Sequence, residues 1–496
     1  MFKKVLIANR GEIALRIIRA CRELGVKTVA VYSEVDKESL HLRYADECYC
    51  VGPAQPEHSY LNIDKIIQTA KNFGCEGIHP GYGFLAQIPS FVKACESNGI
   101  EFIGPSSDAL TKMGTKIRAR EIAANIGVPV IPGSTEAVES EEDVMEVAEK
   151  VGYPVLVKAV YGGGGRGMRI ANNKRDIPQA MELARLEADF AFGNPKLYVE
   201  KLIAKPRHIE FQLLADKKGN IIHLGERDCS IQRRYQKLIE ETPSPIMTNE
   251  LRRAMAKAAI RVAKAVNYTN AGTVEFLVDK EKHFYFLEMN TRLQVEHLIT
   301  EMVTGVDIVK EQIKIAAGEE LTFRQNDIVA RGHAINCRIN CENPYNDFVP
   351  CPGTVTRYHA PGGIGIRVDS ALYPGYTIPV FYDSLIAKLA AWGINRNEAI
   401  QRMKNALDEY EIDGIETTMP FHRRIINDEC FRRGEVDTSF VQEKIGDILA
   451  PETYGDEKAA ALSAVLVSYL TKNRKGLAVI PQRTSRRTSA WRTGRR

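Results

Sequence analysis

The chain has 496 residues, of which 44% are hydrophobic, and a formal net charge of +4. From Thr471 onward it carries nine Lys or Arg and no acidic residue, so the rest holds 58 basic against 63 acidic residues, a charge of about −5. A body of that sign excludes the electrostatic footprint of a nucleic-acid-binding protein. The length exceeds what one hydrophobic core fills, so we expect several lobes.

Neither a membrane span nor a secretory signal is predicted. No stretch approaches the ~20 apolar residues that a span needs, and the apolar run at residues 5–8 is too short for a signal peptide. The ten cysteines are scattered without a Cys-x-x-Cys pair, which is typical of reduced thiols rather than of zinc ligands. We therefore expect a cytoplasmic protein without a membrane partner.

The first hundred residues alternate between strands and helices. Residues 5–8 predict a strand, residues 12–24 an amphipathic helix and residues 28–32 a second strand, with further short strands at 77–78 and 100–104. Short connections of this kind favour a parallel, doubly wound sheet. No G-x-G-x-x-G follows the first strand, so a dinucleotide site is not supported there.

The middle and the end of the chain mix longer strands with helices. A helix begins at Lys116, and residues 154–158 form a strand that enters a glycine-rich loop at residues 162–168. The other expected elements are strands at 197–201, 208–215, 220–225, 272–278 and 284–295, and helices at 250–266, 396–410 and 456–470.

The first candidate site lies on the strand expected at residues 285–296. Side chains alternate between the two faces of a strand, so every second residue shares a face. One face would carry Glu288, Asn290, Arg292, Gln294 and Glu296, and Glu275 on the neighbouring strand would join them. Carboxylate and amide oxygens suit a hard cation such as Mg²⁺. The alternative is an edge strand whose polar face is simply solvated.

The second candidate is the glycine loop at residues 162–168. Glycines let the backbone approach a phosphate closely, and successive N–H groups form an anion-binding nest. Lys116 and Lys158 supply compact charges that suit phosphates. The chain has no G-x-x-x-x-G-K-[ST], so this is not a P-loop. A flexible surface hairpin is the alternative.

A third segment, residues 226–237, mixes acidic, basic and polar residues densely. Composition alone favours a solvated loop, and only the neighbouring motifs suggest a role in a site.

Six motifs together resemble the biotin carboxylase family, in order and at family spacing from Phe2 to Gly446. They are Ile-Ala-Asn-Arg-Gly-Glu-Ile-Ala at 7–14, His-Pro-Gly-Tyr-Gly-Phe at 79–84, the loop at 162–168, Glu-Arg-Asp-Cys-Ser at 226–230, Glu-Met-Asn-Thr-Arg-Leu-Gln-Val-Glu-His at 288–297 and Arg338 in Cys-Arg-Ile-Asn. The likeness is strongest to the biotin carboxylase component of two-subunit pyruvate carboxylases, or to that of acetyl-CoA carboxylase.

The resemblance implies an α/β and α+β multidomain fold. We expect a Rossmann-like N-terminal domain at residues 1–114 and an ATP-grasp domain at 115–330, with a mobile lid at about 131–203. A C-terminal α+β domain would occupy residues 331–447, followed by a helical extension and basic tail at 448–496. That extension is either a docking helix for a partner or a disordered appendage.

The resemblance also implies ATP- and bicarbonate-dependent carboxylation of biotin through carboxyphosphate, and a role for each matching residue. ATP would be bound by Lys116, Lys158, Gly163, Gly164, Gly165, Arg166, Gly167, Met168, Glu200, Lys201, Leu202, Ile203, His208, Gln232, Tyr235, Glu275 and Glu288. Two Mg²⁺ or Mn²⁺ ions would be bound by Glu275, Glu288 and Asn290.

For the chemistry, the resemblance implies that bicarbonate binds to Lys237, Arg292, Gln294 and the Val295 amide. Glu296, beside Arg292, would be the general base, because bicarbonate must lose its proton to attack the γ-phosphate. Arg338 would stabilise the negative charge on the ureido oxygen of biotin. The catalytic set is therefore Lys237, Arg292, Glu296 and Arg338.

Four residues depart from the family pattern. Gln87 and Ile88 stand where Glu and Asn are usual, which removes a carboxylate. Tyr235 replaces a common His or Asn, and Leu298 replaces a usual Pro, which would loosen the adjoining turn.

Biotin is not expected on this chain. The family attaches biotin to a Lys in a Met-Lys-Met context, and the nearest look-alike here is Met403-Lys404-Asn405 in a predicted helix. A separate biotinylated carrier and carboxyltransferase subunit is therefore implied, together with a homodimer of this chain. The acceptor stays open between pyruvate, giving oxaloacetate, and acetyl-CoA, giving malonyl-CoA. Two rival hypotheses are another ATP-grasp ligase that makes an acyl phosphate, and a nucleotide-binding regulatory module without turnover.

Overall fold

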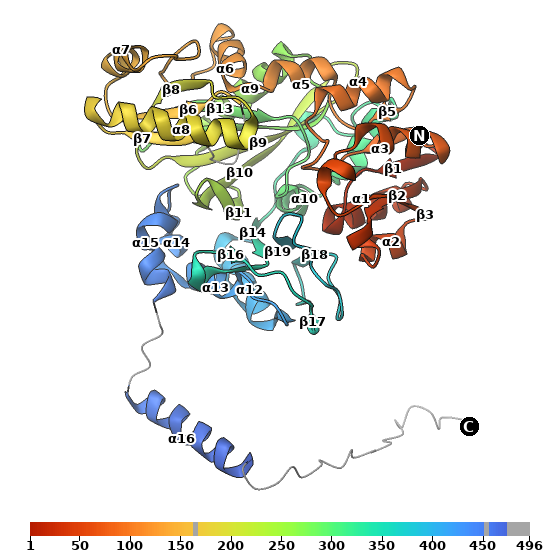
Figure 1. Cartoon of the computed structure of the whole chain (residues 1–496), viewed down its shortest axis with the longest axis vertical. Coiled ribbons are helices and arrows are strands. Elements are labelled where there is room, and N and C mark those ends of the chain that lie inside the picture. The colour runs from red at the N-terminus through yellow and green to blue at the C-terminus, as the bar shows by residue number, and fades with distance from the viewer. Residues whose placement is uncertain (162–166, 451–455, 474–496) are drawn as a thin grey trace. The chain divides into compact units, whose positions relative to one another are not determined.

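The computed structural model describes residues 1–161, 167–450 and 456–473 (Figure 1). It separates into two units, residues 1–449 and residues 450–496. The lobe boundaries expected within the first unit stay predictions.

A five-stranded parallel sheet opens the chain and confirms the doubly wound prediction. Its strand order is β3-β2-β1-β4-β5, and every neighbouring pair is parallel. Its strands are β1 (Lys4–Ile7), β2 (Lys27–Ser33), β3 (Glu47–Gly52), β4 (Gly77–His79) and β5 (Glu101–Phe102). Its helices are α1 (Gly11–Glu23), α2 (Leu40–Tyr44), α3 (Ile63–Asn72), α4 (Pro89–Ser97) and α5 (Ser107–Met113).

A small antiparallel sheet of order β7-β6-β8 follows, with helices α7 and α8 packed on it (Figure 1). Its elements, after α6 (Lys116–Asn125), are α7 (Glu141–Val151), β6 (Val155–Ala159), β7 (Met168–Ala171), α8 (Ile177–Phe192) and β8 (Leu197–Lys201). The residues expected to form a phosphate nest fall between β6 and β7. Gly163, Gly164, Gly165 and Arg166 lie outside the described residues, whereas Gly167 and Met168 lie where β7 begins.

The central feature is an eight-stranded antiparallel sheet of order β13-β12-β9-β10-β11-β14-β19-β18. Its strands are β9 (Arg207–Ala215), β10 (Ile221–Arg233), β11 (Gln236–Thr242), β12 (Asn270–Val278), β13 (Phe284–Asn290), β14 (His333–Asn340), β18 (Ile366–Ser370) and β19 (Leu385–Gly393). Pairing of β11 with β14 carries the sheet across the domain boundary expected near residue 330. The helices in this region are α9 (Asn249–Ala265), α10 (His297–Thr304) and α11 (Ile308–Ala316).

The last part of the first unit packs helices and short strands around the end of this sheet. Its elements are β15 (Glu342–Asn343), β16 (Val349–Pro350), β17 (Arg357–His359), α12 (Arg396–Glu409), β20 (Glu411–Asp413), α13 (Met419–Asn427), α14 (Glu429–Arg433) and α15 (Phe440–Leu449). Their apolar side chains share one buried cluster with residues of β11, β14 and β19.

The second unit contains α16 (Asp456–Asn473), which confirms the expected helix. Leu462, Val465, Leu466 and Tyr469 of α16 are each more than half exposed. None of the helices in the described ranges combines the length and hydropathy that a bilayer span requires.

Two expectations about local structure were wrong. The strand expected to reach residue 295 ends at Asn290; Leu293 is instead fully buried in a cluster with residues of the first sheet, and Glu296 precedes the first turn of α10. The mixed-charge segment is not a solvated loop, because residues 226–233 belong to β10 and most of them are buried. Ionic partners on neighbouring strands compensate the buried charges. Leu298 is fully buried in α10, and its expected effect on the adjoining turn stays a prediction.

A stability test follows from the aromatic core beneath the central sheet. Phe276 is fully buried, with edge-to-face contacts to Phe211, Phe284 and Phe286 at centroid distances of 6.4, 5.6 and 6.4 Å. Phe276→Ala should destabilise the fold by about 3–5 kcal/mol, because it leaves a cavity. The matched control is Phe190→Ala, since Phe190 is 95% exposed. Thermal unfolding should show a clear loss of melting temperature only for Phe276→Ala; equal shifts would contradict the packing.

Candidate active site

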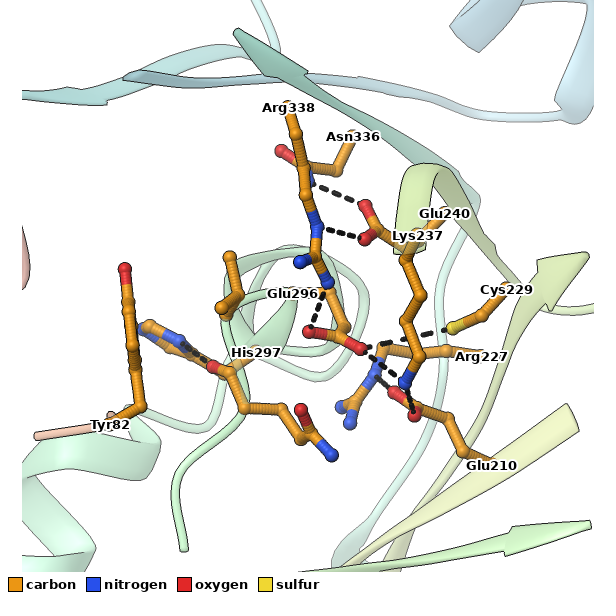
Figure 2. A network of polar contacts seen from close by, with 12 residues as sticks. Tyr82, Glu210, Arg227, Cys229, Lys237, Glu240, Glu296, His297, Asn336 and Arg338 are labelled. Atoms are coloured by element: carbon orange, nitrogen blue, oxygen red, sulfur yellow. Dashed lines mark hydrogen bonds and ion pairs between the residues drawn. The ribbon is translucent and has the colours of Figure 1, made fainter. Parts of the chain in front are cut away.

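Lys237 on β11 is the centre of a buried ionic network (Figure 2). Its ammonium donates to Glu210 Oε2 at 2.5 Å, to Glu275 Oε1 at 2.7 Å and to Glu296 Oε1 at 2.8 Å. The three carboxylates come from β9, β12 and the start of α10, so one cation ties together three separate elements. Buried carboxylates so close together require such a shared cation.

Glu296 is fully buried and placed between two cations. Its second oxygen accepts a hydrogen bond from Arg338 Nη2 at 3.0 Å. Burial alone would raise the pKa of Glu296, but the charges of Lys237, Arg338 and Arg227 hold that pKa well below its usual value. The residue is therefore an ionised carboxylate, and it can accept a proton once Lys237 or Arg338 binds another anion instead.

Arg338 on β14 is oriented by a second acid. Its Nε donates to Glu240 Oε1 at 2.6 Å, and Asn336 Nδ2 donates to the other Glu240 oxygen at 2.7 Å. Glu240 is fully buried. The guanidinium is thus held at two edges, by Glu240 and by Glu296 (Figure 2).

The predicted metal ligands lie together on two paired strands. Glu275 on β12 is directly opposite Glu288 on β13. Asn290 Nδ2 donates to Glu275 Oε1 at 2.8 Å and to Glu288 Oε1 at 3.4 Å, and His208 Nε2 lies 2.8 Å from Glu275 Oε2. Two carboxylates and one amide within contact of each other form a hard oxygen donor set that suits Mg²⁺ or Mn²⁺.

Arg292 and Gln294 join this set from the loop after β13. Arg292 Nη2 donates to Asn290 Oδ1 and its Nη1 to Gln294 Oε1, both at 3.1 Å, and Gln294 Nε2 donates to Glu275 Oε1 at 3.2 Å. Arg292 does not pair directly with Glu296 as expected, since the ionic partners of Glu296 among the described residues are Lys237 and Arg338. Arg292 acts on that carboxylate only at longer range.

The predicted phosphate-binding lysines meet at the base of the small sheet. Lys158 Nζ lies 2.7 Å from Glu200 Oε2, and Arg120 Nε lies 3.3 Å from Glu200 Oε1, all three side chains being buried. Burial, and then the charge of Lys158, lower the pKa of Lys116 to about 8. Three cations around one carboxylate leave a local excess of positive charge, which favours an incoming phosphate.

The other residues predicted to bind the nucleotide lie on several different elements. Lys201 turns its ammonium to the carbonyls of Gly152 and Tyr153, at 2.9 and 2.7 Å. Tyr235 lies in the turn between β10 and β11, with φ of 63° and 47% exposure. Gln232 is buried on β10, and Leu202 and Ile203 follow β8. The ligand roles of the site residues stay predictions.

Sequence reasoning missed several residues of the network. Arg227 is fully buried and donates to Glu210 Oε1 at 2.5 Å, to Gln212 Oε1 at 2.8 Å and to Thr300 Oγ1 at 2.9 Å. A signal existed, because His208, Glu210 and Gln212 share one face of a strand. Glu240 on β11 and Asn336 on β14 are also buried polar residues of the network, and Lys388 is the one charged residue of the otherwise apolar strand β19.

Lys388 links this network to the N-terminal sheet. It is fully buried on β19, lies 3.0 Å from Glu12 Oε2 and donates to the Val295 carbonyl at 3.3 Å. Tyr82 donates to the other oxygen of Glu12. Asn9 Nδ2 in turn donates to the carbonyls of Pro80 and Tyr82 at 2.7 and 2.8 Å, so two of the recognised motifs hold each other in place.

Comparison with known proteins agrees with this geometry over nearly the whole chain. Family models match at residues 1–110 (biotin carboxylase, N-terminal domain), 115–324 (carbamoyl-phosphate synthase L chain, ATP binding domain) and 336–443 (biotin carboxylase C-terminal domain). A pyruvate carboxylase subunit of Methanothermobacter thermautotrophicus is 53% identical over 491 residues, covering 96% of this chain and all of the relative.

Two further matches agree with these. Biotin carboxylase 1 of Bacillus subtilis is 56% identical over 443 residues, covering 89% of this chain and 98% of the relative. The biotin carboxylase domain dimer of Hydrogenobacter thermophilus 2-oxoglutarate carboxylase, solved with MgADP, ADP and bicarbonate, superposes with a TM-score of 0.88 at 50% identity, covering 91% of this chain and 100% of that chain. The expected fold is confirmed, with a Rossmann-like N-terminal part, a central ATP-grasp part and a C-terminal α+β part. The chain belongs to the biotin carboxylase family.

Proposed function

We propose that this protein is a biotin carboxylase subunit, which uses ATP and bicarbonate to carboxylate biotin on a separate carrier chain through carboxyphosphate. The observation that carries the proposal is the position of Glu296, a buried carboxylate between Lys237 and Arg338. The oxygen donor set of Glu275, Glu288 and Asn290 adjoins it through the shared cation Lys237.

The nucleotide would bind between the two clusters of charge. Lys116 and Lys158 would hold its phosphates, and Glu275, Glu288 and Asn290 would bind the divalent ions, whose charge offsets that of the phosphates. The donor set fits such ions, because its carboxylates already lie in contact with hydrogen-bond donors and cations that an ion can replace.

Bicarbonate would bind beside them, on Arg292, Gln294, Lys237 and the Val295 amide. Glu296 would take the bicarbonate proton as the anion attacks the γ-phosphate. When Lys237 turns toward the bound anion, Glu296 loses its strongest charge partner, and its pKa rises toward the value a base requires. The ionic network thus keeps the base ionised at rest and makes it more basic when substrate is bound.

Carboxyphosphate would then release CO₂ and phosphate, and the phosphate would accept the N1′ proton of biotin. The ureido oxygen then carries negative charge, which the guanidinium of Arg338 would stabilise. Glu240 fixes the orientation of that guanidinium in advance. Closure of the small sheet over the site would keep water from the labile intermediate.

The experiment that tests the function measures ATP cleavage with and without bicarbonate and free biotin. We expect cleavage that depends on bicarbonate and increases when biotin is added. A ligase that makes an acyl phosphate for an amine would not respond to biotin, and a regulatory module would show no turnover. Either result would refute the proposal.

Replacement of the base gives a sharper test. Glu296→Gln should lower kcat by about 10²–10⁴-fold, the usual contribution of a general base, because an amide accepts no proton. ATP binding, measured by calorimetry, should persist, since the lysines that hold phosphate are unchanged. The matched control Glu409→Gln, at an exposed position of α12, should behave as the wild type. Normal turnover of Glu296→Gln would exclude its role as base.

We propose pyruvate as the final acceptor, with acetyl-CoA as the alternative. The match to the M. thermautotrophicus relative covers 96% of the 496 residues and leaves about 20 uncovered. Because α16 ends at Asn473, more than 20 residues before the end of the chain, the match must include α16. The match to the B. subtilis relative covers 89% of the chain, close to the length of residues 1–449. The extension is thus shared with a protein named for pyruvate carboxylase, and we propose that α16 binds the biotinylated carboxyltransferase subunit.

The partner proposal predicts a separation of two activities. Leu466→Asp in α16 should abolish co-purification of the biotinylated subunit, because it places a charge among exposed apolar side chains that a partner would bury. Carboxylation of free biotin should stay at the wild-type level. Assays of the assembled enzyme with pyruvate and with acetyl-CoA identify the acceptor. Retained assembly in the variant would refute the docking role of α16.

We further propose a homodimer and a cytoplasmic location. The H. thermophilus structure is named as a dimer, which supports the homodimer. All ten cysteines are free, which is typical of a reducing compartment such as the cytoplasm.

A further inference from the structure

Gln87 connects the N-terminal part of the chain to the anion-binding loop of the candidate site. It lies in the segment that follows β4, and its Oε1 accepts a hydrogen bond from Arg292 Nε at 2.8 Å. Its Nε2 donates to Thr291 Oγ1 at 3.2 Å. One amide therefore holds two successive residues of the loop after β13, and it uses both its donor and its acceptor to do so.

Within the described part of the chain, the hydrogen-bond partners of Arg292 are all neutral. Besides Gln87, they are the Asn290 and Gln294 side-chain oxygens and the carbonyl of Leu293. No carboxylate of the described residues lies within 4.0 Å of its guanidinium, whereas Lys237 and Arg338 each contact at least two carboxylates. Arg292 is thus oriented at its edges without a directly bonded carboxylate, and Glu296, Glu275 and Glu288 act on its charge only at longer range.

A neutral acceptor and a charged one would have different effects at this position. A carboxylate at residue 87 would form an ion pair with Arg292 and compete with any small anion for the same guanidinium. An amide oxygen orients the guanidinium through Nε without neutralising it. The remaining Nη1 and Nη2 edges face Gln294 and Asn290, where the bicarbonate and metal residues meet.

We infer that Gln87 is a positioning residue that sets the affinity for bicarbonate: its neutral amide fixes Arg292 without forming an ion pair that would compete with the substrate anion. This inference rests on the proposed function, and it concerns a residue to which that mechanism gives no role. The uncharged side chain at residue 87 then favours bicarbonate binding, although it lacks the carboxylate that is usual at this position in the family.

The test compares two nearly isosteric variants of the full chain. Gln87→Glu should raise KM for bicarbonate by about three- to fivefold, the effect of one partly exposed competing ion pair, with kcat and KM for ATP within about twofold of the wild type. Gln87→Met keeps the volume and removes both hydrogen bonds without adding charge. It should raise KM for bicarbonate less than Gln87→Glu and lower kcat, because Arg292 is no longer fixed.

The matched control is Gln68→Glu, which adds the same charge at an exposed position of α3 and should leave both KM values unchanged. An unchanged KM for bicarbonate in Gln87→Glu would overturn the inference, as would an equal increase in Gln87→Met or in Gln68→Glu. Failure of the proposed function itself would look different, since the wild-type protein would then show no bicarbonate-dependent ATP cleavage.

Discussion

Lys237 shares one ammonium among three buried carboxylates, and the geometry of the site depends on that contact. Charged groups leave water at a cost of several kcal/mol each, which only close ionic partners offset. Glu210, Glu275 and Glu296 come from elements far apart in the chain, so the lysine fixes where these elements meet. Arg227 and Arg338 supply the remaining positive charge around the same acids, which is why so polar a cluster exists inside a sheet.

In this structure the cations of the network are paired with acids of the protein itself. Under the proposed mechanism, incoming phosphate or bicarbonate would exchange one anionic partner for another, and the pKa of Glu296 would rise when Lys237 turns away from it. Arg292 differs from the other cations, because its partners are neutral amide and carbonyl oxygens. The site thus combines cations that balance buried acids with one cation that contacts no carboxylate among the described residues, which is the one we propose for the substrate anion.

The surroundings of the site come from distant parts of the chain that pack on one another. Lys388 bridges Glu12 of the first helix and the Val295 carbonyl, and Gln87 reaches the neighbouring Arg292 from the segment after β4. The pairing of β11 with β14 places Arg338 beside Glu240, and from there Arg338 reaches Glu296 at the start of α10. Because these contacts join separate lobes, a change in how the lobes pack would alter the anion site directly.

The sequence by itself determined the parallel N-terminal sheet, most helices and the proximity of Glu275, Glu288 and Asn290, because strand and helix periodicities are local properties. It could not determine where β13 ends, since Arg292, Gln294 and Glu296 continue the alternating pattern although Leu293 leaves the sheet for another core. Nor could it show that residues 226–233 are buried: composition indicates a solvated loop, and only tertiary packing supplies the ionic partners that make burial possible. The role of Gln87 likewise depends on a contact across 205 residues of sequence.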